Sequence, residues 1–197
     1  MLEQSLCPCE SATYLEKFHC IVKTMICEMT SAQLKDSISY NFIVQMIPHH
    51  EAAIKMSENI LAYTKNRQIE KIAQNIITTQ KKSIEDMKEI QNSCRCCRNY
   101  HGDLYQYQND LQPIFDTMFS DMQNAYSDAY VNCNFLREMI PHHEGAVRMS
   151  KLTLTNRICP QLKPILHAII EEQEQGICEM QNLLRNCPAK CSNNSEG

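Results

Sequence analysis

Residues 41–57 read NFIVQMIPHHEAAIKMS, and residues 134–150 read NFLREMIPHHEGAVRMS. The two stretches are offset by 93 residues and share the segment Met-Ile-Pro-His-His-Glu at positions 46–51 and 139–144. Matches continue at the same offset, from Tyr14 with Tyr107 to Cys94 with Cys187, without any insertion. Self-similarity at a fixed offset indicates a duplicated structural unit, and here the whole unit is duplicated.

Apolar residues on both sides of the shared segment recur every three or four positions, which is typical of amphipathic helices. The pattern predicts three helices in each unit. In the first unit we expect one helix that begins after an N-cap at Ser11, and two more at about 39–64 and 67–92. In the second unit we expect helices at about 104–128, 132–156 and 160–186, with 93–103 as the linker between the units.

The composition agrees with a helical protein. The 197 residues include only 4 Gly and 7 Pro, and 43% of them are hydrophobic, which is enough for a buried core. We predict an all-α, up-and-down helical bundle built from two pseudo-symmetric three-helix repeats. The repeats span residues 1–98 and 99–191 and pack as one bundle, followed by a disordered tail at 192–197.

Charge and hydropathy argue against two classes of partner. The formal net charge is −4, and the charged residues are interspersed without a basic stripe, so nucleic acid is not an expected partner. No run of 18 apolar residues is present, so we expect no membrane insertion. The first twenty residues lack the apolar stretch of a secretory signal, which favours a cytoplasmic location while leaving the compartment open.

The repeated segment carries the candidate chemistry. Successive residues turn by about 100° on an α-helix, so the imidazoles and thioethers of the segment fall within about a third of the circumference. Imidazole and thioether are suitable ligands for copper(I), and the thioether discriminates against hard cations. The predicted ligands are His49, His50, Met46 and Met56, with His142, His143, Met139 and Met149 in the second unit.

Two methionine pairs one turn apart add further sulfur. These pairs are Met25 with Met29 and, at the same offset, Met118 with Met122. Each pair is able to offer two thioethers to one ion or to fill an irregular core, and the sequence does not separate these roles. Although a single His or a Met stripe is usually a core feature, adjacent His residues flanked by Met in both units favour metal binding.

The chain has 12 Cys, several of them at short spacings near predicted helix ends. These are Cys7, Cys9, Cys94, Cys96, Cys97, Cys187 and Cys191. Such groups suit zinc or copper(I), while disulfides and free thiols are the alternatives. We predict a thiolate reserve for soft metal rather than a full disulfide framework. In an up-and-down bundle, Cys133 and Cys187 would share one pole, and Cys94, Cys96, Cys97 and Cys159 the other.

The motif Met-Ile-Pro-His-His-Glu-x-Ala-x-x-Met-Ser resembles that of the bacterial domain-of-unknown-function family 305, over residues 41–91 and 134–184. The resemblance implies a ferritin-like helical bundle. Members are commonly exported, and some are implicated in copper binding and tolerance, which for this chain implies the His and Met ligands named above. This chain departs from the usual members because it shows no signal peptide and is rich in Cys.

The favoured function is therefore a non-catalytic soft-metal-binding protein for sequestration, buffering or tolerance. Its partners would be metal ions, copper(I) first, with silver(I) or zinc possible; the oligomeric state is open. One alternative is a structural or partner-binding bundle with disulfides. The other is a di-iron enzyme, which needs Glu-x-x-His on two helices. Only Glu16 with His19 fits, and the second unit has Asn109 and Gln112 instead, so we do not expect an enzyme.

Overall fold

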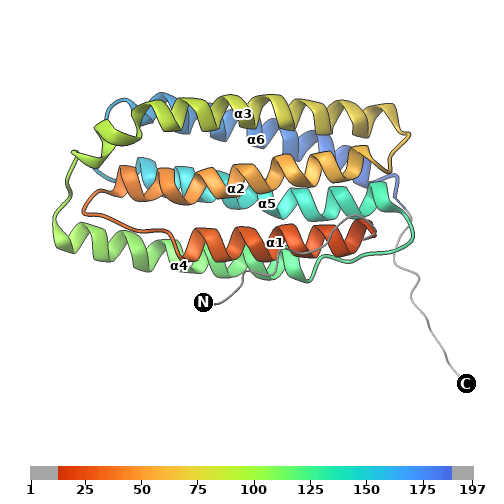
Figure 1. Ribbon diagram of the computed structural model, residues 1–197, viewed down its shortest axis with the longest axis horizontal. Coiled ribbons are helices and arrows are strands. Elements are labelled where there is room, and N and C mark those ends of the chain that lie inside the picture. Colours follow the sequence, from red (N-terminus) through yellow and green to blue (C-terminus); the bar gives the residue numbers. More distant parts are fainter. Residues whose placement is uncertain (1–12, 188–197) are drawn as a thin grey trace, which may run out of the picture.

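The computed structural model describes residues 13–187, and these form α-helices without any strand (Figure 1). The helices are α1 (Tyr14–Thr30), α2 (Ile38–Leu61), α3 (Arg67–Arg95), α4 (His101–Gln123), α5 (Val131–Leu154) and α6 (Leu162–Leu184). The prediction of an all-α bundle is confirmed. None of the described helices is both long enough and apolar enough to cross a bilayer.

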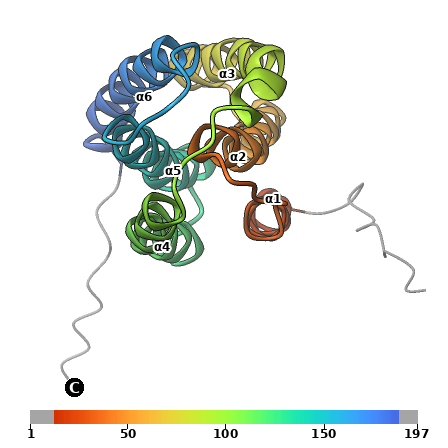
Figure 2. The same ribbon diagram turned by 90° about the vertical axis from the view of Figure 1, so that its left-hand side faces the viewer.

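The helices form three layers of two, seen end-on in Figure 2. One layer holds α1 and α4, the middle layer α2 and α5, and the third α3 and α6, and the two helices of every layer contact each other. Each layer therefore takes one helix from each sequence unit. Because α2 and α5 are covered on two sides, they bury side chains around most of their circumference. In the repeated segment the Met and both His residues are buried, while the Ile, Pro and Glu residues are partly exposed.

The two central helices begin in the same way. Each has 24 residues, and their first residues are 93 positions apart. Near the start of α2, the Asn41 amide accepts a hydrogen bond from the Lys35 backbone N–H (2.7 Å) and donates one to the Lys35 carbonyl (2.9 Å). Asn134 makes the same pair of bonds with Asp128 before α5 (3.0 and 2.8 Å). The repeated Asn-Phe dipeptide thus fixes the loop that leads into each motif helix.

Some predicted boundaries differ from the structure. Helix α3 continues to Arg95 and α4 already begins at His101, so the linker is shorter than the predicted 93–103. The Asn99 side chain holds this short linker in place. Its Oδ1 accepts from the Ile38 backbone N–H (3.0 Å), and its Nδ2 donates to the Arg157 backbone carbonyl (2.7 Å). The first helix is capped by Thr13 and Glu16 in a capping box. Ser11, the predicted cap, and the predicted tail 192–197 lie outside the described residues.

A buried polar contact joins α1 to the second unit. The Tyr14 hydroxyl donates to the Glu138 carboxylate on α5 (2.5 Å), and both side chains are buried. The Tyr14 carbonyl accepts from the Asn59 amide on α2 (3.0 Å). At the position equivalent to Glu138 the first unit has Gln45, which donates to the Met29 carbonyl instead (3.4 Å). The tie between α1 and α5 therefore has no equivalent contact between α4 and α2.

Candidate functional site

The four histidines of the two repeated segments lie in the interior, where α2 meets α5. All four are at most 2% exposed. The His49 and His142 rings stack, with centroids 3.6 Å apart and an interplanar angle of 27°. The prediction that the two motif helices pack against each other through their histidine faces is confirmed.

Adjacent histidines point to different neighbours. The His49 and His50 ring centroids are 6.0 Å apart, and those of His142 and His143 are 5.9 Å apart. His50 turns to α3, where its Nε2 lies 3.1 Å from the Ser83 hydroxyl. Each segment therefore presents one imidazole to the opposite unit and the next one to its own third helix, as the turn of about 100° per residue requires.

The second unit differs at the equivalent of Ser83, which is Gly176. Instead of offering a hydroxyl, Gly176 packs directly against the ring of His143: a Cβ placed at Gly176 would lie 3.1 Å from His143 Cδ2 and 3.3 Å from Nε2. Neither Ser83 nor Gly176 was among the predicted site residues. The signal that could have indicated them is the offset of 93 residues, which places both opposite the second His of the motif.

Few nitrogens of the four imidazoles have partners. His142 Nε2 donates to the His49 carbonyl (3.0 Å), which requires the proton on Nε2 and leaves the Nδ1 lone pair available. Within residues 13–187, several buried ring nitrogens make no hydrogen bond of full geometry: both nitrogens of His49 and Nδ1 of His50, His142 and His143. The His49 and His143 rings have only weaker contacts, with the His142 and Met139 backbone. Buried polar atoms are normally satisfied, so this concentration of unpaired nitrogens is unusual.

Burial keeps these rings neutral. Desolvation lowers the pKa of His50 to about 3 and that of His142 to about 4. The pKa values of His49 and His143 are also held well below the ordinary range, first by desolvation and then by the charge that the neighbouring imidazoles would carry. At neutral pH the rings therefore keep the lone pairs that metal ligation needs.

The predicted thioether residues are buried in the same core. Each is at most 1% exposed: Met25, Met29, Met46, Met56, Met118, Met122, Met139 and Met149. Met118 lies directly over the backbone of α5, since a Cβ at Gly145 would come within 2.0 Å of its Sδ. Across the described part of the chain, no three His, Cys, Asp or Glu side chains are placed so that they could hold a metal ion. The histidines are thus gathered without forming a ready-made centre of such ligands.

Other buried polar side chains near the motif helices also have unpaired atoms. Among the described residues, both amide atoms of Gln80 and the carbonyl oxygen of Gln173 have no partner, and the same holds for the Ser57 and Ser150 hydroxyls at the end of the motif. These residues occupy equivalent positions in the two units. The unpaired polar atoms therefore extend from the histidines onto α3 and α6.

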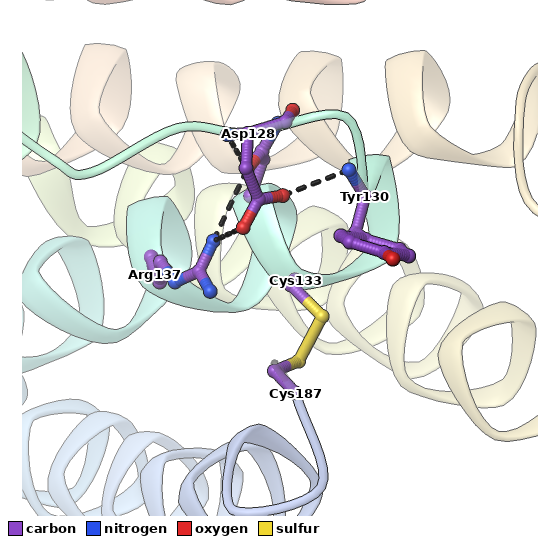
Figure 3. A network of polar contacts seen from close by, with 6 residues as sticks. Asp128, Tyr130, Cys133, Arg137 and Cys187 are labelled. Atoms are coloured by element: carbon purple, nitrogen blue, oxygen red, sulfur yellow. Dashed lines mark hydrogen bonds and ion pairs between the residues drawn. A yellow bond between two sulfur atoms is a disulfide. The ribbon is translucent and has the colours of Figure 1, made fainter. Parts of the chain in front are cut away.

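The cysteine prediction is wrong for Cys187. Its sulfur forms a disulfide with Cys133, with an S–S distance of 2.07 Å, so it is not a free thiolate (Figure 3). The bond joins the first turn of α5 to the residues after α6, beside Asp128, which accepts hydrogen bonds from the Tyr130 N–H (2.8 Å) and the Arg137 guanidinium (3.0 Å).

At the opposite pole the predicted Cys group is divided. Cys94 is buried and Cys97 is half-buried. Cys96 is exposed, and its thiol donates to the Asn92 carbonyl (3.8 Å). The thiols of Cys94 and Cys97 meet Cys159, which we had placed at this pole but not among the ligands. Cys7, Cys9 and Cys191 lie outside the described residues.

The residues considered for a di-iron centre do not face the interior. The Glu16 carboxylate accepts from the backbone N–H of Thr13 (2.7 Å), as part of the capping box that starts α1. Both Glu16 and His19 are exposed. Their spacing therefore reflects the beginning of a helix rather than a pair of inward-facing ligands.

The chain is similar to known proteins in both sequence and fold. The sequence model of a family described as domain of unknown function (DUF305) matches residues 19–91 and, in a second match, 39–184. A crystal structure of a DUF305 fragment from Deinococcus radiodurans has a similar fold, with a TM-score of 0.55 and 19% identity, covering 79% of this chain and 99% of that one. None of the curated proteins matches this chain.

Proposed function

The chain belongs to the domain-of-unknown-function family DUF305, and on that basis we propose that its paired histidines bind a soft metal ion, copper(I) first, for sequestration or buffering. The observation that carries the proposal is His49. Its imidazole is fully buried, neither of its nitrogens makes a hydrogen bond of full geometry among the described residues, and its ring stacks on His142 of the other unit.

The energetics support a ligand here. A buried polar group without a partner destabilises a fold by about 1–3 kcal/mol, and several such nitrogens are concentrated around the contact of α2 with α5. A neutral imidazole carries a lone pair on one nitrogen and a proton on the other, so a bound cation would satisfy one nitrogen of each ring that it contacts. The rings are neutral at physiological pH, so no proton has to be displaced from the nitrogens that carry a free lone pair.

The surroundings favour a soft cation over a hard one. Thioethers are buried on the same helices, whereas the carboxylates of the repeated segments, Glu51 and Glu144, are partly exposed. Imidazole and thioether together select copper(I), with silver(I) as a chemical analogue and zinc as a weaker candidate. His49, His50, His142 and His143 would hold the ion, with Met46, Met56, Met139 and Met149 as the available thioethers.

We propose a binding role rather than catalysis. The site lies between four helices with no opening to solvent at the histidines, which suits retention of an ion better than turnover of a substrate. The other residues named as ligands at the sequence level, the cysteines, are not needed for this site.

The test is a copper(I) titration of metal-free protein under anaerobic conditions, in competition with a chromophoric copper(I) chelator. The His49→Ala/His142→Ala variant should lose the copper that the parent withholds from the chelator. The matched control is His167→Ala, which removes an exposed imidazole from α6 and should bind as the parent does. Circular dichroism of all three proteins checks that the helices are intact.

The comparison of the double variant with the parent is needed because exposed thiols also bind copper(I). Copper binding that is equal in the parent and the double variant would assign the uptake to cysteines and leave the histidines as core residues. In that case the function would be that of a structural bundle, for which the Cys133–Cys187 disulfide is the supporting observation.

A further inference from the structure

Three thiols meet at the pole where α3 ends and where the chain passes from α5 to α6. Cys94 lies in the last turn of α3 and is fully buried, and Cys97 follows three residues later and is half-buried. Cys159 lies in the loop before α6 and is 3% exposed. Cys97 lines one pocket with Ile158 and Pro160, the two neighbours of Cys159. The Cys159 thiol donates to the Gln161 side-chain oxygen (3.7 Å) and interacts with both the Cys94 and the Cys97 thiols.

The backbone around these thiols is fixed by hydrogen bonds, one of which joins the two sequence units. The Cys159 N–H donates to the Ser39 hydroxyl of α2 (2.8 Å), and the Ser37 hydroxyl donates to the Cys94 carbonyl (2.7 Å). The Asn99 amide holds the Arg157 carbonyl two residues before Cys159 (2.7 Å). The proximity of the thiols is therefore built into the meeting of α2, α3 and the loop before α6.

The three thiols differ in acidity. Burial raises the pKa values of Cys94 and Cys97, and their contacts with Cys159 raise them further. Burial acts on Cys159 in the same direction, but its interactions with the Cys94 and Cys97 thiols and with the Gln161 and Leu162 backbone outweigh it and lower its pKa. Cys159 is thus the sulfur of the three on which negative charge is best supported, near the start of a helix.

Only one of the three thiols reaches the surface. Cys97 lines a surface pocket of about 550 Å³ together with Cys96, Arg98, Arg157, Ile158 and Pro160. Cys94 and Cys159 are not among its lining residues and lie behind it. Arg157 makes the pocket attractive to an anionic molecule and acts electrostatically on the Cys97 thiol, favouring its thiolate, while Arg98 is paired with Asp36 (3.2 Å).

We propose that Cys97 and Cys159 form a reversible dithiol–disulfide site, oxidised by an anionic low-molecular-weight disulfide that enters the pocket at Cys97. The Cys97 thiolate attacks one sulfur of the small disulfide, forms a mixed disulfide and releases one small thiolate. The Cys159 thiolate then attacks the Cys97 sulfur, forms the Cys97–Cys159 bond and releases the second small thiolate. Two protein thiols lose two electrons and two protons in total, and one small disulfide becomes two small thiols.

Cys94 gives this site a third member. Its thiol contacts Cys159 from the buried side, so it is placed to attack the Cys159 sulfur and return Cys97 to the free thiol. Cys159 is then the sulfur common to both oxidised forms. In either form a covalent bond joins the end of α3 to the loop before α6, and thus the first sequence unit to the second.

The opposite pole shows that this fold accepts such a bond. There Cys187, the sequence equivalent of Cys94, is bonded to Cys133 within the second unit (Figure 3). The residue equivalent to Cys133 in the first unit is Tyr40, so Cys94 has no such partner and meets Cys159 of the second unit instead. The two poles therefore carry different sulfur chemistry: a formed disulfide at one, and a thiol group with access to solvent at the other.

The experiment uses full-length protein dialysed against a chelator, so that no metal thiolate masks the thiols. The protein is equilibrated with oxidised glutathione, an anionic disulfide, then alkylated and digested without reductant for mass spectrometry. The parent should yield peptides that link Cys159 to Cys97 or Cys94. In Cys159→Ser, Cys97 should accumulate as a stable glutathione adduct, because the second thiolate is missing.

Two further variants separate the proposal from random oxidation. Cys96→Ser removes the exposed neighbour in the same pocket and should oxidise as the parent does. Cys97→Ser should oxidise at least tenfold more slowly, because the remaining two thiols are buried. The proposal is overturned if Cys159 is recovered alkylated after equilibration, or if adducts collect on Cys96, Cys27 and Cys178 while Cys97 stays free. Equal rates for Cys97→Ser and the parent would overturn the assigned role of Cys97.

Discussion

Replacing Glu138 by Gln tests how the bundle treats its buried carboxylate. Glu138 is 2% exposed on α5 and accepts from the Tyr14 hydroxyl at 2.5 Å. Desolvation raises its pKa from 4.5 to about 7, and the Tyr14 hydrogen bond offsets only part of that rise. The first unit has Gln at the equivalent position 45, so the fold already accommodates the amide there.

The expected magnitude follows from proton linkage. Because the folded state holds its proton up to a higher pH than the unfolded state, Glu138 destabilises the fold as pH rises from about 4.5 to about 7. With these two pKa values the destabilisation is about 0.8 kcal/mol at a pH of about 5 and about 3.4 kcal/mol at a pH of about 8. The stability of Glu138→Gln relative to the parent should therefore increase by about 2.5 kcal/mol from the lower to the higher pH.

The assay is urea unfolding of the metal-free parent and variant at both pH values. Taking the difference between the two pH values removes any pH-independent effect of burying an amide, and histidine titration cancels because both proteins share it. Glu144→Gln is the control: its carboxylate is partly exposed and paired with Arg148 (3.1 Å), so its relative stability should change by no more than about 0.5 kcal/mol. A relative stability of Glu138→Gln that stays constant with pH would refute the raised pKa.

Three further predictions concern the core, the disulfide and acid stability. Gly145→Ala should destabilise the protein by about 1–2 kcal/mol in thermal or urea unfolding, because its Cβ would come within 2.0 Å of the Met118 Sδ, whereas Gly102→Ala, with no atom within 4 Å, should be neutral or slightly stabilising. Cys187→Ser should lower the free energy of unfolding by about 2–4 kcal/mol by removing the bond to Cys133, and a midpoint unchanged between variant and parent would contradict this. The metal-free protein should lose stability as pH falls below about 6.5, by up to about 1.4 kcal/mol per pH unit for each of the four motif histidines. The cause is that these histidines become protonated in the unfolded chain while burial keeps them neutral in the folded one. A flat profile of unfolding free energy between pH values of about 6.5 and 5 would refute it.

The helix order and the histidine contact were predictable from the sequence. An offset of 93 residues without insertion requires equivalent helices, and two helices that each bear a long apolar face bury it most readily against each other. The stacking of His49 on His142 follows from that packing. The buried state of the methionines followed from the same periodicity.

The partners of each imidazole were not predictable. Ser83 reaches His50, but the equivalent Gly176 packs directly on His143, and this difference becomes meaningful only when the distance between α3 and α2 is known. The Cys133–Cys187 bond was missed for a similar reason. Short spacing along the chain suggested local thiol groups, whereas the bond is set by which helix ends meet in space, 54 residues apart in sequence.

Two of the differences between the two units lie where the units touch. Glu138 accepts from Tyr14 of the other unit, and this bond has no counterpart at Gln45 of the first unit. His142 Nε2 donates across the contact to the His49 carbonyl (3.0 Å), whereas the His49 ring interacts with the His142 backbone without reaching full hydrogen-bond geometry. The second imidazole of the stacked pair is therefore held less firmly than the first. An ion bound between them would therefore meet His142 Nδ1 on a firmly oriented ring and His49 on a more loosely held one, which predicts that His49→Ala lowers copper(I) affinity less steeply than His142→Ala.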